Sequence, residues 1–169
     1  MTQLYLVRHG ETFDNERQMM QGQTPGELNP TGIRQAEALS LLLADVPFQA
    51  VVASDLHRAI QTARIVAAPH RLPVATTALL RERDWGSFTG RFIPDLKDVS
   101  PWPDDIESLP ALKERARLFL QFIRENWPQQ TVLAVGHGII NKAIQAVYFG
   151  KEMNEVEKMK NAEVRILDI

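Results

Sequence analysis

The chain has 169 residues, no cysteine and a formal net charge of -2. Its length predicts one domain over residues 1–169, and 44% hydrophobic with 24% charged residues is ordinary for a globular protein with a buried core. The absence of cysteine excludes disulfides, thiolate nucleophiles and cysteine-based metal sites. The nearly balanced charge argues against nucleic acid as a partner, because such binding rests on clustered positive charge.

The sequence also argues against a membrane partner. No segment approaches the run of about 18 apolar residues that a membrane-spanning helix needs. Residues 1–3 lead directly into an apolar run, without the basic region and cleavage site of a signal peptide. We therefore expect a cytoplasmic protein.

Strands and helices are predicted to alternate along the chain. Short apolar runs bounded by polar or turn residues predict strands, and segments with apolar residues at helical spacing predict helices. In chain order the predicted elements are strand Leu4–Val7, a helix from Pro30 that ends by Pro47, strand Ala50–Ala53, a helix from Ser54 to about Ala67, strand Leu72–Thr76, helix Leu112–Trp127, strand Thr131–Val135, helix Ile139–Phe149 and edge strand Glu163–Ile169.

Cap and turn residues mark the boundaries of these elements. Asn29 suits the N-cap of the first helix, with proline following at its first position, and Ser54 is expected to cap the second helix. Residues 84–110 differ from the rest, because they contain four prolines and two tryptophans without clear periodicity. We expect this stretch to form a lid, with Trp85 and Trp102 packed at its base.

The alternation predicts an α/β fold, a three-layer αβα sandwich with a mainly parallel central sheet and a short lid. Polar residues follow three of the strands. Arg8 and His9 come after the first strand, Arg58 lies in the helix after the second, and His137 follows the fourth. In such sheets the ligand crevice lies at the carboxyl ends of the strands. We therefore expect these four side chains to converge at one edge.

Arg58 is informative on physical grounds. In the first turn of a helix its charge faces the positive end of the helix dipole, a penalty that a bound anion would reverse. His137 precedes a helix in a similar position, where phosphate groups bind readily. Two guanidinium groups and an imidazole suit a phosphoryl group. From spacing alone, two separate surface salt bridges remain an alternative.

Five motifs stand in order along the chain. They are LVRHGET over residues 6–12 followed by Asn15, LNPTGIRQA over 28–36, SDLHRAIQTA over 54–63, LRERDWGSFTG over 80–90 and VGHG over 135–138. Together they resemble the motifs of the histidine phosphatase superfamily, in its phosphoglycerate mutase-like branch. The resemblance covers most of the chain, from Leu4 to about Val164.

The resemblance implies phosphoryl transfer in two steps through a phosphohistidine. His9 would be the nucleophile, and Arg8, Arg58 and His137 would hold the non-bridging phosphoryl oxygens. Glu82 would protonate the leaving oxygen and then activate water. The reaction would need neither a metal nor a cofactor, because the arginines would offset the charge that magnesium offsets in other phosphoryl-transfer enzymes.

The resemblance also implies a set of residues that bind substrate or phosphate. These are Asn15, Gln21, Gly22, Gln23, Gly138 and Ile139. The sequence departs from the usual pattern at three places: Ile139 stands where a small residue is common, Lys142 where arginine is common, and Ile106 where a Gly-Glu-Ser motif has its glycine. These departures bear on the identity of the substrate more than on the chemistry.

The favoured activity is hydrolysis of a small phosphate monoester. Mutases of this family carry a long basic insertion after the glutamate, whereas residues 91–107 contain two basic and five acidic residues, which should repel polyanions. Phosphoglycerate mutase-type transfer remains an alternative, as do a phosphohistidine phosphatase that acts on proteins and a non-catalytic phosphate-binding module. The final edge strand leaves a homodimer open.

Overall fold

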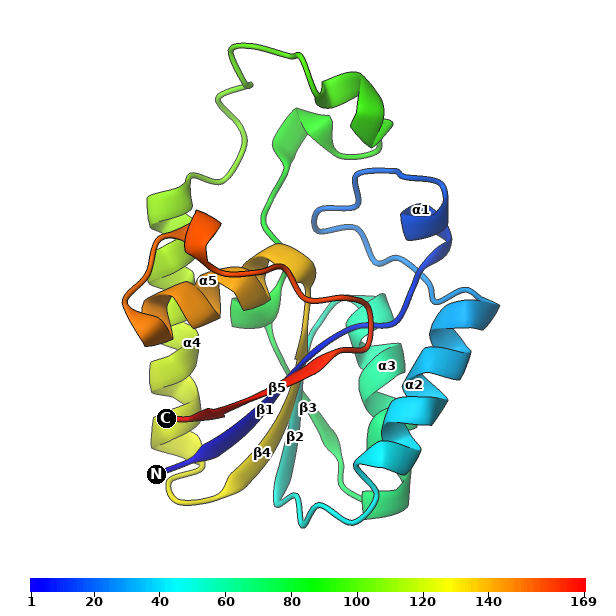
Figure 1. The fold of residues 1–169 in the computed structure, drawn as a ribbon, viewed down its shortest axis with the longest axis vertical. Coiled ribbons are helices and arrows are strands. Elements are labelled where there is room, and N and C mark those ends of the chain that lie inside the picture. The colour runs from blue at the N-terminus through cyan, green and yellow to red at the C-terminus, as the bar shows by residue number, and fades with distance from the viewer.

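Five strands form one sheet, and helices cover both of its faces (Figure 1). The computed structural model describes all residues 1–169. The sheet has the order β3-β2-β4-β1-β5, with β1 at Gln3–Arg8, β2 at Ala50–Ser54, β3 at Val74–Thr77, β4 at Thr131–Gly136 and β5 at Val164–Asp168. Neighbouring strands are parallel except β1 and β5, which are antiparallel. The predicted α/β fold with a mainly parallel sheet is confirmed.

Two long helices lie on each face of the sheet. The helices are α1 (Phe13–Glu16), α2 (Pro30–Leu42), α3 (His57–Ala67), α4 (Leu109–Asn126) and α5 (Gly138–Phe149). In Figure 1, α2 and α3 cover one face and α4 and α5 the other, while α1 is a short turn in the loop after β1. Each face buries its own apolar cluster, with Leu39 and Val66 on the first side and Phe119 and Ile144 on the second. None of the helices combines the length and apolar character that crossing a membrane requires.

The central strand β4 explains how the sheet positions a site. Its sequence, TVLAVG, is buried from its second residue to its last, as expected for a parallel strand covered on both faces. β4 pairs with β1 on one side and with β2 on the other. The residues that follow these three strands therefore emerge side by side at the carboxyl edge of the sheet.

The helix starts agree only in part with the predicted caps. Asn29 caps α2 as predicted, and its side-chain oxygen accepts a hydrogen bond from the N–H of Gly32 at 2.8 Å. The prediction that Ser54 caps the next helix is wrong. Ser54 ends β2, and α3 begins at His57 after Leu56, which occupies the N-cap without a side-chain hydrogen bond. The Ser54 hydroxyl instead accepts a hydrogen bond from the N–H of Leu56, before the helix begins.

Two further boundaries move because of local chemistry. α4 begins at Leu109, earlier than predicted, because the Ser108 hydroxyl caps it by accepting a hydrogen bond from the N–H of Ala111. β3 begins at Val74, later than predicted, after Pro73, which has no N–H to donate to a neighbouring strand. The first of these shifts shortens the lid to residues 84–108, which we call the lid segment.

The lid segment contains no α-helix or strand, only short 3₁₀ turns. It extends past the carboxyl ends of the central strands and approaches the loop around α1 (Figure 1). Backbone hydrogen bonds join the two loops: the N–H of Met20 donates to the carbonyl of Arg91 at 2.9 Å, and the N–H of Ile93 donates to the carbonyl of Gln18 at 2.8 Å. The carboxyl edge of the sheet is thus enclosed from two sides.

Candidate active site

The structure brings Arg8, His9, Arg58 and His137 together, as their places after neighbouring strands predicted. Arg8 is the last residue of β1 and His9 follows it, Arg58 lies in the first turn of α3, and His137 is the N-cap of α5. His9, Arg58 and His137 are buried. The two histidine rings lie 5.0 Å apart, measured between their centroids.

His9 is held in one tautomer. Its Nδ1 lies 2.7 Å from the carbonyl oxygen of Gly10, and because a carbonyl can only accept, Nδ1 carries the hydrogen. Nε2 therefore keeps a lone pair, which here accepts a hydrogen bond from Nε of Arg58 at 3.3 Å. Burial, together with the charges of Arg58 and Arg8, holds the pKa of His9 well below its usual value. A neutral imidazole with an unprotonated Nε2 is the form that can act as a nucleophile once the long contact with Arg58 gives way to a substrate.

His137 is oriented through Ser54. Nε2 of His137 lies 2.8 Å from the Ser54 hydroxyl, which already accepts a hydrogen bond from the N–H of Leu56. The hydroxyl hydrogen of Ser54 has no other acceptor within hydrogen-bond distance, so we assign it to Nε2 of His137, which places the ring hydrogen on Nδ1. Burial and the charge of Arg58 lower the pKa of His137, so this ring is also neutral.

The two arginines are fixed by backbone carbonyls. Arg58 donates to the carbonyl oxygens of Thr24 and Gly22, and Arg8 donates to that of Met159 at 2.8 Å. Burial lowers the pKa of Arg58 to about 10, which leaves the side chain protonated at neutral pH. Nε of Arg8 is buried without a hydrogen-bond partner, and so is Nδ1 of His137. Buried donors rarely stay unpaired, and these two suit the oxygens of a bound anion.

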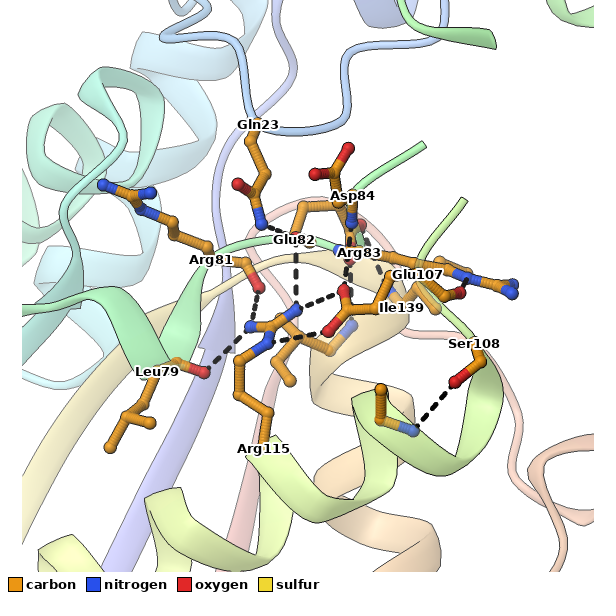
Figure 2. Close-up of polar contacts among 12 residues, drawn as sticks. Gln23, Leu79, Arg81, Glu82, Arg83, Asp84, Glu107, Ser108, Arg115 and Ile139 are labelled. Carbon is orange, nitrogen blue, oxygen red and sulfur yellow. Dashed lines mark hydrogen bonds and ion pairs between the residues drawn. The ribbon is translucent and has the colours of Figure 1, made fainter. Parts of the chain in front are cut away.

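Glu82 lies at the N-terminus of α5. Its Oε1 accepts hydrogen bonds from the N–H groups of Arg83 at 2.8 Å and Ile140 at 3.0 Å, and its Oε2 accepts one from Ile139 at 3.1 Å. Figure 2 shows Glu82 next to Ile139. These three donors fix the orientation of the Glu82 carboxyl group at the start of α5. Oε2 accepts only one of the three bonds, so it retains a free lone pair.

Arg115 of α4 fixes the segment that carries Glu82 (Figure 2). Its guanidinium donates to the backbone carbonyls of Leu79, Arg81 and Glu82, and it forms a two-pronged ion pair with the Glu107 carboxylate at 2.8 and 3.1 Å. Glu107 in turn accepts a hydrogen bond from the N–H of Asp84 at 3.0 Å. Sequence reasoning missed Arg115, because no motif marks it.

A cavity of about 180 Å³ opens beside His9. Four of the expected binding residues line it: Asn15, Gln21, Gly22 and Ile139. Two others do not. The side-chain amide of Gln23 donates to the carbonyl of Glu82 at 3.2 Å instead. Gly138 does not line the cavity either. A Cβ added at Gly138 would lie 2.6 Å from Cε of Lys158, so glycine permits this close approach.

Several residues at this cavity were not predicted. They are Met19, Met20, Ile93 and Lys158, together with Trp85, which was expected only to pack at the base of the lid. Lys158 adds a third cation to Arg8 and Arg58, and partial desolvation together with the charge of Arg8 lowers its pKa. It comes from the loop before β5, where no sequence pattern marked it. No group of three or more histidine, aspartate or glutamate side chains is arranged to hold a metal ion.

The acidic residues of the lid segment do not face the site, contrary to the expectation that they repel polyanions. None of Asp95, Asp98, Asp104, Asp105 and Glu107 lines the cavity. Glu107 is paired with Arg115, and the Asp105 carboxylate accepts hydrogen bonds from Ser87 at 2.9 and 3.1 Å. The charge balance of a loop says little about a neighbouring cavity when the charged side chains do not line it.

A pocket lined by two arginines, a lysine and a histidine at the carboxyl edge of a parallel sheet has the composition that suits an anionic ligand. The sequence model of the histidine phosphatase superfamily (branch 1) matches residues 4–169. The chain belongs to this superfamily, which confirms the resemblance drawn from its motifs.

Individual relatives agree with this assignment. PhoE of Bacillus subtilis (strain 168), named an uncharacterized phosphatase, is 37% identical over 142 residues, which cover 82% of this chain and 72% of that protein. Adenosylcobalamin/alpha-ribazole phosphatase of Escherichia coli (strain K12) is 34% identical over 155 residues, which cover 83% and 76%. The solved structure of Bacillus stearothermophilus YhfR has a TM-score of 0.93 at 28% identity and covers 100% of this chain and 92% of that one.

Proposed function

We propose that this protein hydrolyses the phosphate monoester of a small metabolite through a phosphohistidine on His9, without a metal or a cofactor. The observation that carries the proposal is a buried, neutral His9, with its Nε2 lone pair facing Arg58, near the unpartnered donors of Arg8 and His137. The family membership and the phosphatases among its relatives support the same reaction class.

In the first step Nε2 of His9 attacks phosphorus. The new P–N bond forms as the ester P–O bond breaks, and the leaving oxygen takes a proton from Glu82. In the second step the Glu82 carboxylate takes a proton from water, whose oxygen attacks phosphorus and breaks the P–N bond. Inorganic phosphate leaves, and both His9 and Glu82 return to their starting forms.

The cationic groups stabilise the transferred phosphoryl group. Arg8, Arg58 and Lys158 line the cavity beside His9 and would face the non-bridging oxygens of this group. His137 does not line this cavity, but its ring lies 5.0 Å from that of His9, and its unpartnered Nδ1–H would donate to one of these oxygens. Because most of these groups are already fixed by backbone hydrogen bonds, little rearrangement is needed when the phosphoryl group binds.

Phosphoglycerate mutase-type transfer is the alternative activity, and one assay separates it from hydrolysis. The purified protein is supplied with a panel of phosphorylated metabolites, including 3-phosphoglycerate with and without 2,3-bisphosphoglycerate. We expect release of inorganic phosphate, unchanged by a chelator, and loss of that release in His9→Ala. Conversion of 3-phosphoglycerate to 2-phosphoglycerate without phosphate release would favour the mutase, and full turnover by His9→Ala would refute the nucleophile.

Two further properties stay predictions from the sequence. We propose a cytoplasmic location for the protein. We also propose that two copies pair through the free edge of β5, where the Ile166 side chain is 52% exposed. Light scattering of the purified protein tests the pairing, because a monomer at high concentration would contradict it.

A further inference from the structure

A second, larger cavity adjoins the one beside His9. It has a volume of about 590 Å³, within the usual size of small-molecule sites. The two cavities share four lining residues, which are Asn15, Met20, Trp85 and Ile93. The larger cavity therefore lies next to the cavity beside His9, within reach of the organic part of a phosphate ester bound there. We call it the lid cleft.

The walls of the lid cleft are mostly apolar and aromatic. Its apolar lining consists of Met20, Trp85, Phe88, Ile93, Pro94, Leu96 and Trp102, and its polar lining of Asn15, Gln18 and Lys97. Trp102 is 49% exposed and Ile93 is 44% exposed, although both are large apolar side chains. Apolar surface left open inside a hollow beside a reaction site is typical of a ligand-binding surface.

The aromatic side chains of the lid cleft are held by contacts within the protein. Trp102 makes edge-to-face contacts with Trp85, at 5.6 Å between ring centroids, and with Phe88, at 5.8 Å. The buried Arg83 packs on both tryptophans, with its guanidinium carbon 4.7 Å from the Trp85 centroid and 5.5 Å from that of Trp102. Nε of Arg83 also donates to the carbonyl of Glu107 at 2.8 Å. The guanidinium of Arg83, fixed by its hydrogen bond to Glu107, thus supports the two tryptophan rings.

The charge in the lid cleft decides between ligand classes. Lys97 is the only charged side chain among its lining residues, and the acidic residues of the lid segment lie elsewhere. A phosphorylated sugar acid or a bisphosphate would bring several anionic and hydroxyl groups into a cleft that offers them few donors. An apolar ring would instead bury its surface against the tryptophans and Phe88, which is favourable.

From these observations we infer that the lid cleft binds the leaving alcohol and selects phosphate monoesters whose alcohol carries an apolar ring. This inference rests on the proposed function, because it assigns the leaving group of the same reaction. Trp102 is the residue through which it is tested most directly. Trp102 does not line the cavity beside His9, so its truncation removes cleft surface without removing a phosphate contact.

The test compares three alkyl phosphates: 2-phenylethyl phosphate, ethyl phosphate and 3-phosphoglycerate. All three have alkoxide leaving groups, so the selectivity reports contacts of the organic part. We expect kcat/KM for 2-phenylethyl phosphate to exceed that for ethyl phosphate roughly tenfold or more, with 3-phosphoglycerate the poorest. In Trp102→Ala the preference for the phenyl compound should fall roughly tenfold. In Phe149→Ala, which removes an exposed aromatic ring outside both cavities, the preference should not change.

A binding measurement makes the test independent of turnover. Two variants, His9→Ala and the double variant His9→Ala with Trp102→Ala, are each titrated calorimetrically with 2-phenylethyl phosphate and with ethyl phosphate. If the phenyl compound binds more tightly and Trp102→Ala removes this advantage, the cleft assignment is supported even when no ester is hydrolysed. In that case only the proposed function fails. Hydrolysis of all three esters without preference, or equal binding of both ligands, would overturn the cleft assignment and leave the proposed hydrolysis standing.

Discussion

The floor of the candidate site and its wall are built in different ways. The floor consists of Arg8, His9, Arg58 and His137, which follow the central strands and are fixed by buried hydrogen bonds to carbonyls and to Ser54. The wall is the mostly apolar lining of the lid cleft, which stands on loops with short 3₁₀ turns and is held by aromatic contacts. Groups that must meet a phosphoryl group stand on rigid elements, whereas the surface that meets the variable organic part stands on loops.

Removing a cation from the floor should have the largest effect. We expect Arg58→Ala to lower kcat/KM for every phosphate ester by roughly a hundredfold or more, because Arg58 contacts Nε2 of His9 and is proposed to hold the phosphoryl group. Steady-state kinetics on one alkyl and one aryl ester measures this. A loss confined to one ester would mean that Arg58 acts on the leaving group and that the floor and the wall are not separate.

Glu82 lies at the boundary between floor and wall, and its role depends on the leaving group. We expect Glu82→Gln to slow alkyl phosphates by roughly a hundredfold or more, because an alkoxide needs a proton to leave. Aryl phosphates with acidic leaving groups should slow far less. Rates across a series of esters of graded leaving-group pKa measure this difference. Equal slowing across the series would count against the general-acid role.

Arg115 should act through Glu82, as a positioning residue. We expect Arg115→Ala to lower kcat for alkyl phosphates roughly tenfold with little change in KM, because three carbonyls of residues 79–82 and the Glu107 carboxylate lose their donor. The same leaving-group dependence as in Glu82→Gln should appear. This dependence separates positioning from a general loss of folded protein.

Two variants sharpen the Arg115 experiment. Arg117→Ala removes an arginine from the same helix, where its ion pair with Glu114 is exposed, and it should leave kcat unchanged. Arg115→Lys keeps the charge but not the fork of donors, and it should recover only part of the activity. If Arg115→Ala slows aryl and alkyl esters alike, its link to Glu82 is wrong.

The pH dependence of stability tests the buried histidines of the floor. The pKa values of His9 and His137 are lowered in the folded protein, so only the unfolded chain takes up these protons near pH 6. Their stabilising contribution is therefore present above the unfolded pKa of about 6.5 and decreases as pH falls below it. We expect the free energy of unfolding to fall by up to about 1.4 kcal/mol per pH unit for each histidine.

Urea denaturation at pH 7.5 and 5.5 measures this change. His9→Gln should reduce the pH dependence, whereas His57→Gln, at an exposed position on α3, should leave it as it is. An unchanged dependence in His9→Gln would show that His9 titrates normally in the folded protein and is not the buried neutral base described above.

The floor and the wall also differ in how far their residues could be predicted from the sequence. Arg8, His9, Arg58 and His137 could be predicted because each follows a strand in a parallel sheet, and the topology then brings strand ends together. Trp102 packs against Trp85 in the lid segment as predicted. Its place in the lid cleft and the position of Lys158 could not be predicted, because they depend on how long loops fold back over the sheet. Arg115 was also missed, since it acts on backbone carbonyls, which carry no residue-specific signal.

Ser54 illustrates a different kind of failure. A serine before a helix favours an N-cap, but here the helix begins later and the hydroxyl faces His137. The hydroxyl makes a local bond with the N–H of Leu56 and a tertiary bond with His137, and only the first of these could be expected from neighbouring residues in the sequence.

The central claim is that the phosphoryl group passes through His9, and trapping it there tests this most directly. The protein is mixed with a phosphate ester radiolabelled in its phosphoryl group and quenched within milliseconds to seconds. We predict a label on the protein that is stable in alkali and lost in acid, that maps to His9 and that is absent from His9→Ala. Burst release of phosphate with no label trapped at any time, in a wild-type enzyme that turns over, would contradict the claim and favour direct attack by water.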